Sequence, residues 1–362
     1  MNLWVLFLTV GAVLVIQNLV VRFFAFRGLK YTRRVSRNTV YAGETVSLTE
    51  VIRNDRPLFI PWMLVESRVS PYAVFGKRSD LEVSGERYHR SFFTLMPYRQ
   101  ITRVHRVTLK RRGEYDLGHL QLTCGDLVGM GCASSEVNER AFVRVYPAKI
   151  RLDVPYLPLL SVQGDIPDVR SLMRDSCLFS GVREYRMGDS VRDIHWPATG
   201  KTGTLQVKVH DPVSSVNLMV VLNSQLRGDQ WGKLTEDEEN RVEYGISFAS
   251  ALISWALDQG AGAGFSTDMT EGDGGDAPMI LPDSRKEQKE KILMCMSRLV
   301  FKRQKRFVTY LDEFLRFRDL DILIVSAYAD GELKLKMKEL GRFHRSVALC
   351  LFDGDKRVWT ET

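Results

Sequence analysis

The sequence has few cysteines and no arrangement of them that marks a common site. They form no CxxC pair and their number, five, is odd: Cys124, Cys132, Cys177, Cys295 and Cys350. This argues against a cysteine zinc site and against a disulfide framework. We therefore expect reduced, mostly buried thiols in a cytosolic compartment. The Gly-rich stretch at residues 270–277 (TEGDGGDA) lacks the GxGxxG and GK[ST] patterns and the EF-hand spacing, so neither a phosphate-binding loop nor a calcium loop is predicted there.

Acidic residues are less numerous than basic residues in this sequence. The 362 residues include 51 Lys and Arg against 44 Asp and Glu, which gives a net charge of +7. Such a balance favours attraction to polyanions. The excess gathers just after the first apolar segment, where it fits membrane topology better, and no nucleic-acid-binding module is present. The length predicts two or three domains.

The N-terminal segment is apolar. Residues 3–21 (LWVLFLTVGAVLVIQNLVV) carry no charge and are long enough for a transmembrane helix. A cleaved signal peptide would need a basic start and a small-residue cleavage site, and neither is there. The basic residues all follow the segment: Arg22, Arg27, Lys30, Arg33 and Arg34. By the positive-inside rule we expect a single-pass anchor over residues 1–25, in the cell membrane, with the bulk of the chain cytoplasmic.

Alternating polar and apolar residues dominate residues 31–150. Residues 45–52, 101–109 and 142–146 have the period of half-buried strands. Turn residues separate them, which predicts a small β-sandwich-like domain. Three histidines in or beside these strands lack metal-like spacing, so we expect them at the surface or as satisfied polar groups: His89, His105 and His119.

Residues 151–212 are predicted to be a Pro-containing connector followed by a polar motif, and residues 213–362 to be a further domain. In that domain strand-like and helix-like segments alternate, with apolar runs at 216–222, 262–267, 321–326 and 347–352. This order predicts a mainly parallel, doubly wound α/β sheet. The expected fold class is α/β plus all-β, behind a transmembrane helix.

The polar motif covers residues 181–208 (GVREYRMGDSVRDIHWPATGKTGTLQVK). Its candidate residues for an interaction surface or an interdomain contact are Arg183, Glu184, Tyr185, Gly188, Asp189, Arg192, Asp193, His195 and Trp196. A catalytic interpretation would use Asp189, Asp193 and His195 as acid, base and orienting group, but no nucleophile or metal spacing supports it. We favour ion pairs between the arginines and the acids, with Tyr185 and Trp196 packing, and predict no catalytic, cofactor or metal residue.

The motif resembles the signature of the domain of unknown function 58 family. The similarity includes the β-domain segments 112–115, 125–126, 129–130 and 145–147, and the strand at 218–222. It implies a membrane-anchored protein with a von Willebrand factor A-like C-terminal domain. It also implies cooperation with a MoxR-type AAA+ ATPase in assembly or maturation of other proteins, without enzymatic activity. Members commonly carry two N-terminal transmembrane helices, whereas one is predicted here.

A von Willebrand factor A domain would carry a DxSxS metal motif after its first strand. The matching residues here are 223–227 (NSQLR), and a hard cation prefers carboxylates to a nearby guanidinium. Asp330, with Thr267 or Asp268, could supply later ligands, but we expect no tight magnesium site. The predicted function is therefore an interaction scaffold that works with the ATPase; the alternative is a metal-dependent adhesion-type or hydrolytic domain using this degenerate site.

Overall fold

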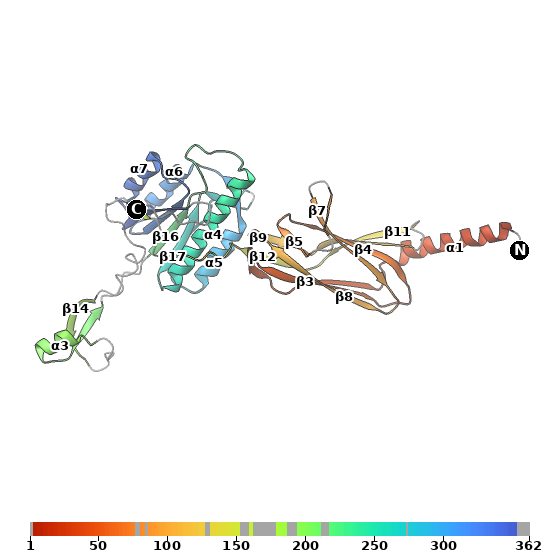
Figure 1. Cartoon of the computed structure of the whole chain (residues 1–362), viewed down its shortest axis with the longest axis horizontal. Helices are drawn as coiled ribbons and strands as arrows, with labels where there is room; N and C mark the ends of the chain where they lie inside the picture. The colour runs from red at the N-terminus through yellow and green to blue at the C-terminus, as the bar shows by residue number, and fades with distance from the viewer. Residues whose placement is uncertain are drawn as a thin grey trace. The chain divides into compact units, whose positions relative to one another are not determined.

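The computed structural model describes residues 3–76, 80–83, 86–126, 131–152, 159–161, 179–186, 194–210, 217–272 and 274–352. It divides into two compact units, Met1–Ala148 and Lys149–Thr362 (Figure 1). The part of the chain that the structure describes is mixed α/β with six sheets, which replaces the fold class predicted from the sequence.

The first unit begins with helix α1 (Leu3–Phe24). No helix in the part of the chain that the structure describes is long and apolar enough to cross a membrane. On this finding the predicted anchor over residues 1–25 and the single-pass localisation are wrong. The lipid contact predicted through residues 3–21 stays a prediction.

The rest of the first unit is built from three sheets. The first has the order β1-β3-β8-β5 and the second β11-β10-β4-β7-β6. The third, β2-β12-β9, contains the parallel pair β12–β2. The strands are β1 (Leu29–Val35), β2 (Thr39–Tyr41), β3 (Thr45–Asn54), β4 (Ile60–Val69), β5 (Ala73–Phe75), β6 (Asp80–Val83), β7 (Glu86–Leu95), β8 (Gln100–Leu109), β9 (Gly113–Asp116), β10 (His119–Gly125), β11 (Cys132–Asn138) and β12 (Phe142–Tyr146).

Alternation of side chains explains these strands. In β3 every second residue from Val46 onward is buried, as the pleat requires of a strand with one face on a core. Val46 and Leu48 join one apolar cluster and Ile52 another. The inward face of β3 therefore contributes to both apolar cores of the unit.

The second unit contains a six-stranded sheet with the order β13-β22-β21-β16-β17-β19. Its four inner strands run parallel, and the two edge strands pair antiparallel. The strands are β13 (Leu159–Ser161), β16 (Asn217–Leu222), β17 (Gly262–Thr267), β19 (Met279–Asp283), β21 (Asp321–Ser326) and β22 (Ser346–Leu351). The helical segments are α4 (Glu236–Asp258), α5 (Glu287–Arg298), α6 (Phe307–Tyr310), η4 (Leu311–Arg316) and α7 (Gly331–Leu340), and β18 (Met269–Glu271) pairs with β20 (Leu299–Arg303).

Helices cover both faces of this sheet (Figure 1). Leu218, Val220 and Leu222 pack in the cluster that contains α4 and α5. Met219 and Val221 pack in the cluster that contains α6, η4 and α7. A strand buried on both faces reads as a continuous apolar run, which is why β16 could be predicted from its sequence. Helix α4 begins at a capping box, in which Thr235 and Glu238 each bond the other's backbone N–H.

A separate two-stranded ribbon joins β14 (Phe179–Glu184) and β15 (Gln206–His210), with helix α3 (Trp196–Thr202) between them. We call residues 179–186 and 194–210 the motif hairpin, because they carry the described part of the polar motif.

Candidate functional site

The motif hairpin holds the described part of the predicted interaction site. Arg183 and Glu184 lie at the end of β14, and Trp196 is the first residue of α3. The backbone N–H of Tyr185 donates to the carbonyl of Leu205 at 2.8 Å, which closes the ribbon beside the helix. Four of the predicted residues lie outside the described residues: Gly188, Asp189, Arg192 and Asp193.

His195 has a structural task in this hairpin. Its Nδ1 accepts a hydrogen bond from the backbone N–H of Ala198 at 3.0 Å, so it caps the N-terminus of α3. Pro197 in the first turn suits a helix start, and Gly203 ends the helix in the left-handed conformation. With Nδ1 accepting, the ring hydrogen is on Nε2. In this arrangement Nδ1 is engaged in capping rather than poised for proton transfer.

The hairpin exposes an unusual amount of apolar surface for so small an element. Trp196 is 65% exposed, Leu205 45%, Val182 44% and Tyr185 36%. The charged side chains of Arg183 and Glu184 are exposed beside them. Arg183 donates to the backbone carbonyl of Glu184 at 3.1 Å, and its ion pair with an acid of the motif stays a prediction.

The residues after β16, where a metal motif was considered, form a closed hydrogen-bond network. Asn223 Nδ2 donates to Ser326 Oγ at 3.0 Å. Ser224 donates to Asp268 twice, from its backbone N–H and from its hydroxyl, each at 2.9 Å. Asp330 caps α7 by accepting from the N–H of Leu333 at 2.8 Å. Both carboxylate oxygens of Asp268 and one of Asp330 thus accept hydrogen bonds from protein donors.

The Asp268 carboxyl group is completely enclosed in this network. Burial raises its pKa to about 6, although the two hydrogen bonds from Ser224 and the nearby charge of Arg303 act in the opposite direction. The carboxylate is therefore charged near neutral pH at a cost in stability.

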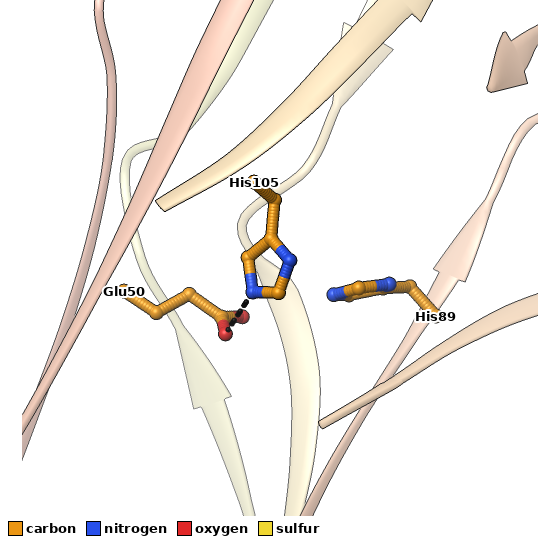
Figure 2. Close-up of side chains that lie close together, drawn as sticks. All are labelled: Glu50, His89 and His105. Carbon is orange, nitrogen blue, oxygen red and sulfur yellow. Dashed lines mark hydrogen bonds and ion pairs between the residues drawn. The ribbon is translucent and has the colours of Figure 1, made fainter. Parts of the chain in front are cut away.

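A second polar cluster lies in the core of the first unit. Glu50 comes from β3, His105 from β8 and His89 from β7, so the cluster draws on two sheets. One ligand-type atom from each of the three side chains lies within 4.8 Å of the other two. Glu50 Oε2 and His105 Nε2 are 2.9 Å apart, and the two imidazole rings meet edge to face with centroids 4.6 Å apart. Figure 2 shows the His89 ring directed toward the other two side chains.

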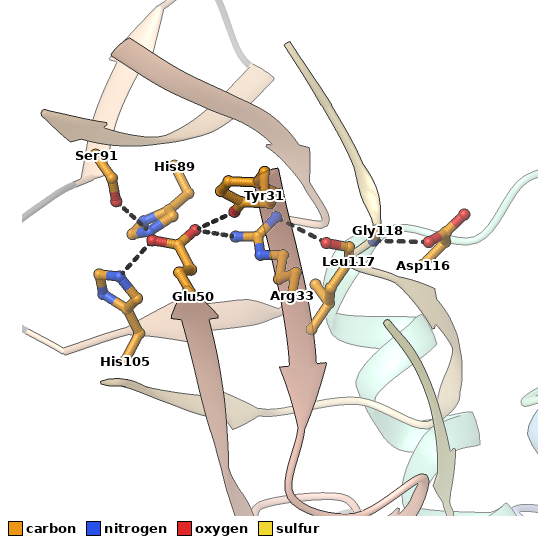
Figure 3. Close-up of polar contacts among 9 residues, drawn as sticks. All are labelled: Tyr31, Arg33, Glu50, His89, Ser91, His105, Asp116, Leu117 and Gly118. Atoms are coloured by element: carbon orange, nitrogen blue, oxygen red, sulfur yellow. Dashed lines mark hydrogen bonds and ion pairs between the residues drawn. The ribbon is translucent and has the colours of Figure 1, made fainter. Parts of the chain in front are cut away.

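Arg33 on β1 holds the other oxygen of Glu50. Its NH2 lies 3.3 Å from Glu50 Oε1, and both side chains are fully buried. The same oxygen accepts from the Tyr31 hydroxyl at 3.0 Å, while Arg33 NH1 donates to the Leu117 carbonyl at 2.7 Å. Ser91 Oγ lies 3.2 Å from His89 Nε2. Figure 3 shows the contact between Ser91 and His89 and, separately, the contacts that run from His105 through Glu50 and Arg33 to Leu117.

The surroundings set the ionisation of these groups. Burial alone would raise the pKa of Glu50, but the hydrogen bond from His105 and the charge of Arg33 lower it to about 2. Burial lowers the pKa of His89 to about 3, and burial raises the pKa of Tyr31 above its usual range. At neutral pH the cluster therefore holds an ionised carboxylate beside a neutral His89 imidazole and the Arg33 guanidinium.

The spacing of these residues along the chain does not indicate the cluster. The face of the strand that each charged residue occupies does indicate a buried polar group. Glu50 occupies the same face of β3 as Leu48 and Ile52. Arg33 likewise shares the inward face of β1 with Tyr31. A charged residue in an apolar phase of a strand signals a buried polar group, since successive side chains alternate between faces.

Comparison with known proteins bears on the hairpin and the strands that follow it. Residues 181–274 match the family described as "Protein of unknown function DUF58". The DUF58 match starts in β14 and runs through α3, β15, β16, α4 and β17.

One relative is the "Uncharacterized protein YeaD" of Bacillus subtilis (strain 168), which is 21% identical over 246 residues. The aligned region is 67% of this chain and 57% of YeaD, so the chain spans little more than half the length of this relative.

Two solved structures resemble about a third of the chain. A CARDB domain from Pyrococcus furiosus is 16% identical over 32% of this chain and 96% of its own, with a TM-score of 0.19. A non-cellulosomal cohesin from Archaeoglobus fulgidus is 11% identical over 32% of this chain and 91% of its own, with a TM-score of 0.21. TM-scores of this size carry no argument about function.

The buried Arg33–Glu50 pair predicts strong energetic coupling. Arg33→Met leaves a buried carboxylate without its cationic partner, so we expect a loss of about 3–5 kcal/mol in the free energy of unfolding. Glu50→Gln should cost a comparable amount, whereas the double variant should cost less than the sum of the two. Urea unfolding of the full chain in EDTA measures all three.

The exposed ion pair Lys289–Asp258, at 3.2 Å, provides the control for this comparison of single and double variants. Lys289→Met should cost no more than about 1 kcal/mol. Strict additivity of Arg33→Met and Glu50→Gln would contradict the coupling.

Asp268 predicts a specific pH dependence. Its pKa is raised from 3.8 to about 6 on folding, so between these values the folded state binds a proton that the unfolded state has released. Stability should therefore fall by on the order of 1–3 kcal/mol as the pH rises from about 4 to 7. Asp268→Asn should remove this decline while keeping a hydrogen-bonding partner for Ser224.

Urea unfolding at a series of pH values measures this effect as the difference between wild type and variant. Asp258→Asn, at an exposed carboxylate, should retain the wild-type slope. An Asp268→Asn protein with an unchanged slope would show that this carboxyl does not titrate as described.

Proposed function

We propose that this protein is a non-enzymatic interaction protein and that the motif hairpin is its docking surface for a MoxR-type AAA+ ATPase. The observation that carries the proposal is the exposed apolar surface of the hairpin, with Trp196 at 65% exposure and Leu205 at 45%. Exposed aromatic side chains among charged ones are typical of binding hot spots, in which Trp, Tyr and Arg are enriched.

The construction of the hairpin supports the same proposal. His195 and Gly203 cap both ends of α3, and Gln206 N–H donates to Thr199 Oγ1 at 3.0 Å to tie the helix to β15. Such ties keep Trp196 in place before a partner arrives, which lowers the entropy cost of binding. The identity of the partner rests on the resemblance of the motif to its family.

Two other functions fit less well. A catalytic motif would need Asp189 and Asp193 beside His195, but both acids lie outside the described residues, and the cap of α3 leaves His195 only Nε2 for proton transfer. A metal-dependent adhesion-type domain would need oxygen ligands after β16, yet the carboxylate of Asp268 accepts two hydrogen bonds from Ser224.

Trp196→Ala provides the test of the docking role. We expect it to weaken binding of the purified ATPase to the full chain at least tenfold, because truncation of an aromatic hot spot costs about 2 kcal/mol or more. Trp231→Ala is the matched control, since Trp231 is 61% exposed in the same unit but outside the hairpin. Biolayer interferometry with a purified MoxR-type ATPase measures the affinities.

Three results would contradict the proposal. The wild-type chain could fail to bind the ATPase, which would show that the ATPase is not its partner. Trp196→Ala could bind as wild type does while keeping its circular dichroism spectrum, which would show that the hairpin is not the docking surface. Trp231→Ala could weaken binding as much as Trp196→Ala, which would place the surface elsewhere.

A further inference from the structure

The buried cluster in the first unit has the donor set of a metal site. Glu50 supplies a carboxylate oxygen, and His89 and His105 supply imidazole nitrogens, all within 4.8 Å of one another. Two imidazoles and one carboxylate are a combination that binds zinc and related transition metals. The three strands that carry them belong to two different sheets, so the arrangement depends on the folded unit.

We propose that Glu50, His89 and His105 bind one divalent transition-metal ion of the zinc class. The site is independent of the docking surface proposed for the motif hairpin.

The distances suit such an ion after small side-chain movements. Zinc lies about 2.0–2.2 Å from nitrogen and carboxylate ligands, which places ligand atoms roughly 3–4 Å apart. Glu50 Oε2 and His105 Nε2 are 2.9 Å apart, slightly less than this range, and all three ligand atoms lie within 4.8 Å of one another. The ion would take the place of the hydrogen that joins His105 to Glu50, and that ring hydrogen would move to Nδ1.

Contacts around the three residues orient them as outer-shell groups orient metal ligands. Glu50 Oε1 is held by Tyr31 and Arg33, which turns Oε2 toward His105 (Figure 3). Phe75 stacks on the His89 ring with centroids 4.1 Å apart and an interplanar angle of 14°. The carboxylate and one imidazole are thus positioned before an ion arrives.

Arg33 also determines which class of ion fits. Its guanidinium already offsets the charge of Glu50, so the site offers little net negative charge. Magnesium and calcium depend on several hard oxygen ligands, whereas zinc gains affinity from neutral imidazole nitrogens. The side chain of His105 is 18% exposed while that of Glu50 is fully buried, so of these two ligands His105 is the one that reaches solvent.

Isothermal titration of the EDTA-treated full chain with zinc chloride tests the proposal. We expect one zinc ion per chain, and no saturable binding of magnesium chloride. His105→Gln should weaken zinc binding at least tenfold, since Gln can still donate to Glu50 but removes the imidazole ligand. His119→Gln is the matched control, because His119 is 69% exposed and lies in the same unit.

Thermal unfolding gives a second measurement. Zinc should raise the Tm of wild type and of His119→Gln but leave that of His105→Gln unchanged, because an ion that binds the folded state stabilises it. Absence of zinc binding to wild type would overturn the proposal, as would unaltered binding by His105→Gln or loss of binding in His119→Gln. ATPase affinity should be the same for wild type and His105→Gln, which separates this site from the docking surface.

Discussion

The ion pair between Arg33 and Glu50 is the constraint on which the first unit depends. Both side chains are fully buried, and an isolated charge in such a place would cost several kcal/mol. Hydrogen bonds from Tyr31 and His105 to Glu50, and from Arg33 to the Leu117 carbonyl, offset part of that cost, although Nε and Nη2 of Arg33 have no hydrogen-bond partner among the described residues. These partners come from β1, β8 and the segment between β9 and β10, so satisfying one carboxylate fixes several strands at once.

The second unit and the motif hairpin do not depend on a buried ion pair of this kind. In the six-stranded sheet, apolar clusters cover both faces, and the polar groups after β16 bond to one another. The motif hairpin instead leaves Trp196 and Leu205 exposed on an element whose helix is capped at both ends. An element that is already ordered and exposes apolar side chains is suited to binding, because it loses little conformational entropy when a partner binds.

Much of the second unit could be predicted from the sequence, because its signals are local. The apolar run at residues 321–326 predicts β21 (Asp321–Ser326), which is confirmed. The absence of charge over residues 3–21 predicts an anchor, but no described helix is long and apolar enough to cross a membrane. The cluster around Glu50 could not be predicted, because it depends on which strands of two sheets meet. The alternation of side chains along β3 places Glu50 on the same buried face as Leu48 and Ile52. It therefore indicates a buried Glu50 but not the partners of that residue.

Hydrogen–deuterium exchange of the full chain with and without the MoxR-type ATPase tests the central claim most directly. The claim is that the motif hairpin docks the partner while the network around Glu50 serves the folded first unit. The account predicts slower exchange in peptides from β14, α3 and β15 when the ATPase is present, and unchanged exchange in β1, β3 and β8. Protection confined to the strands of the first unit, with the motif hairpin unaffected, would contradict it.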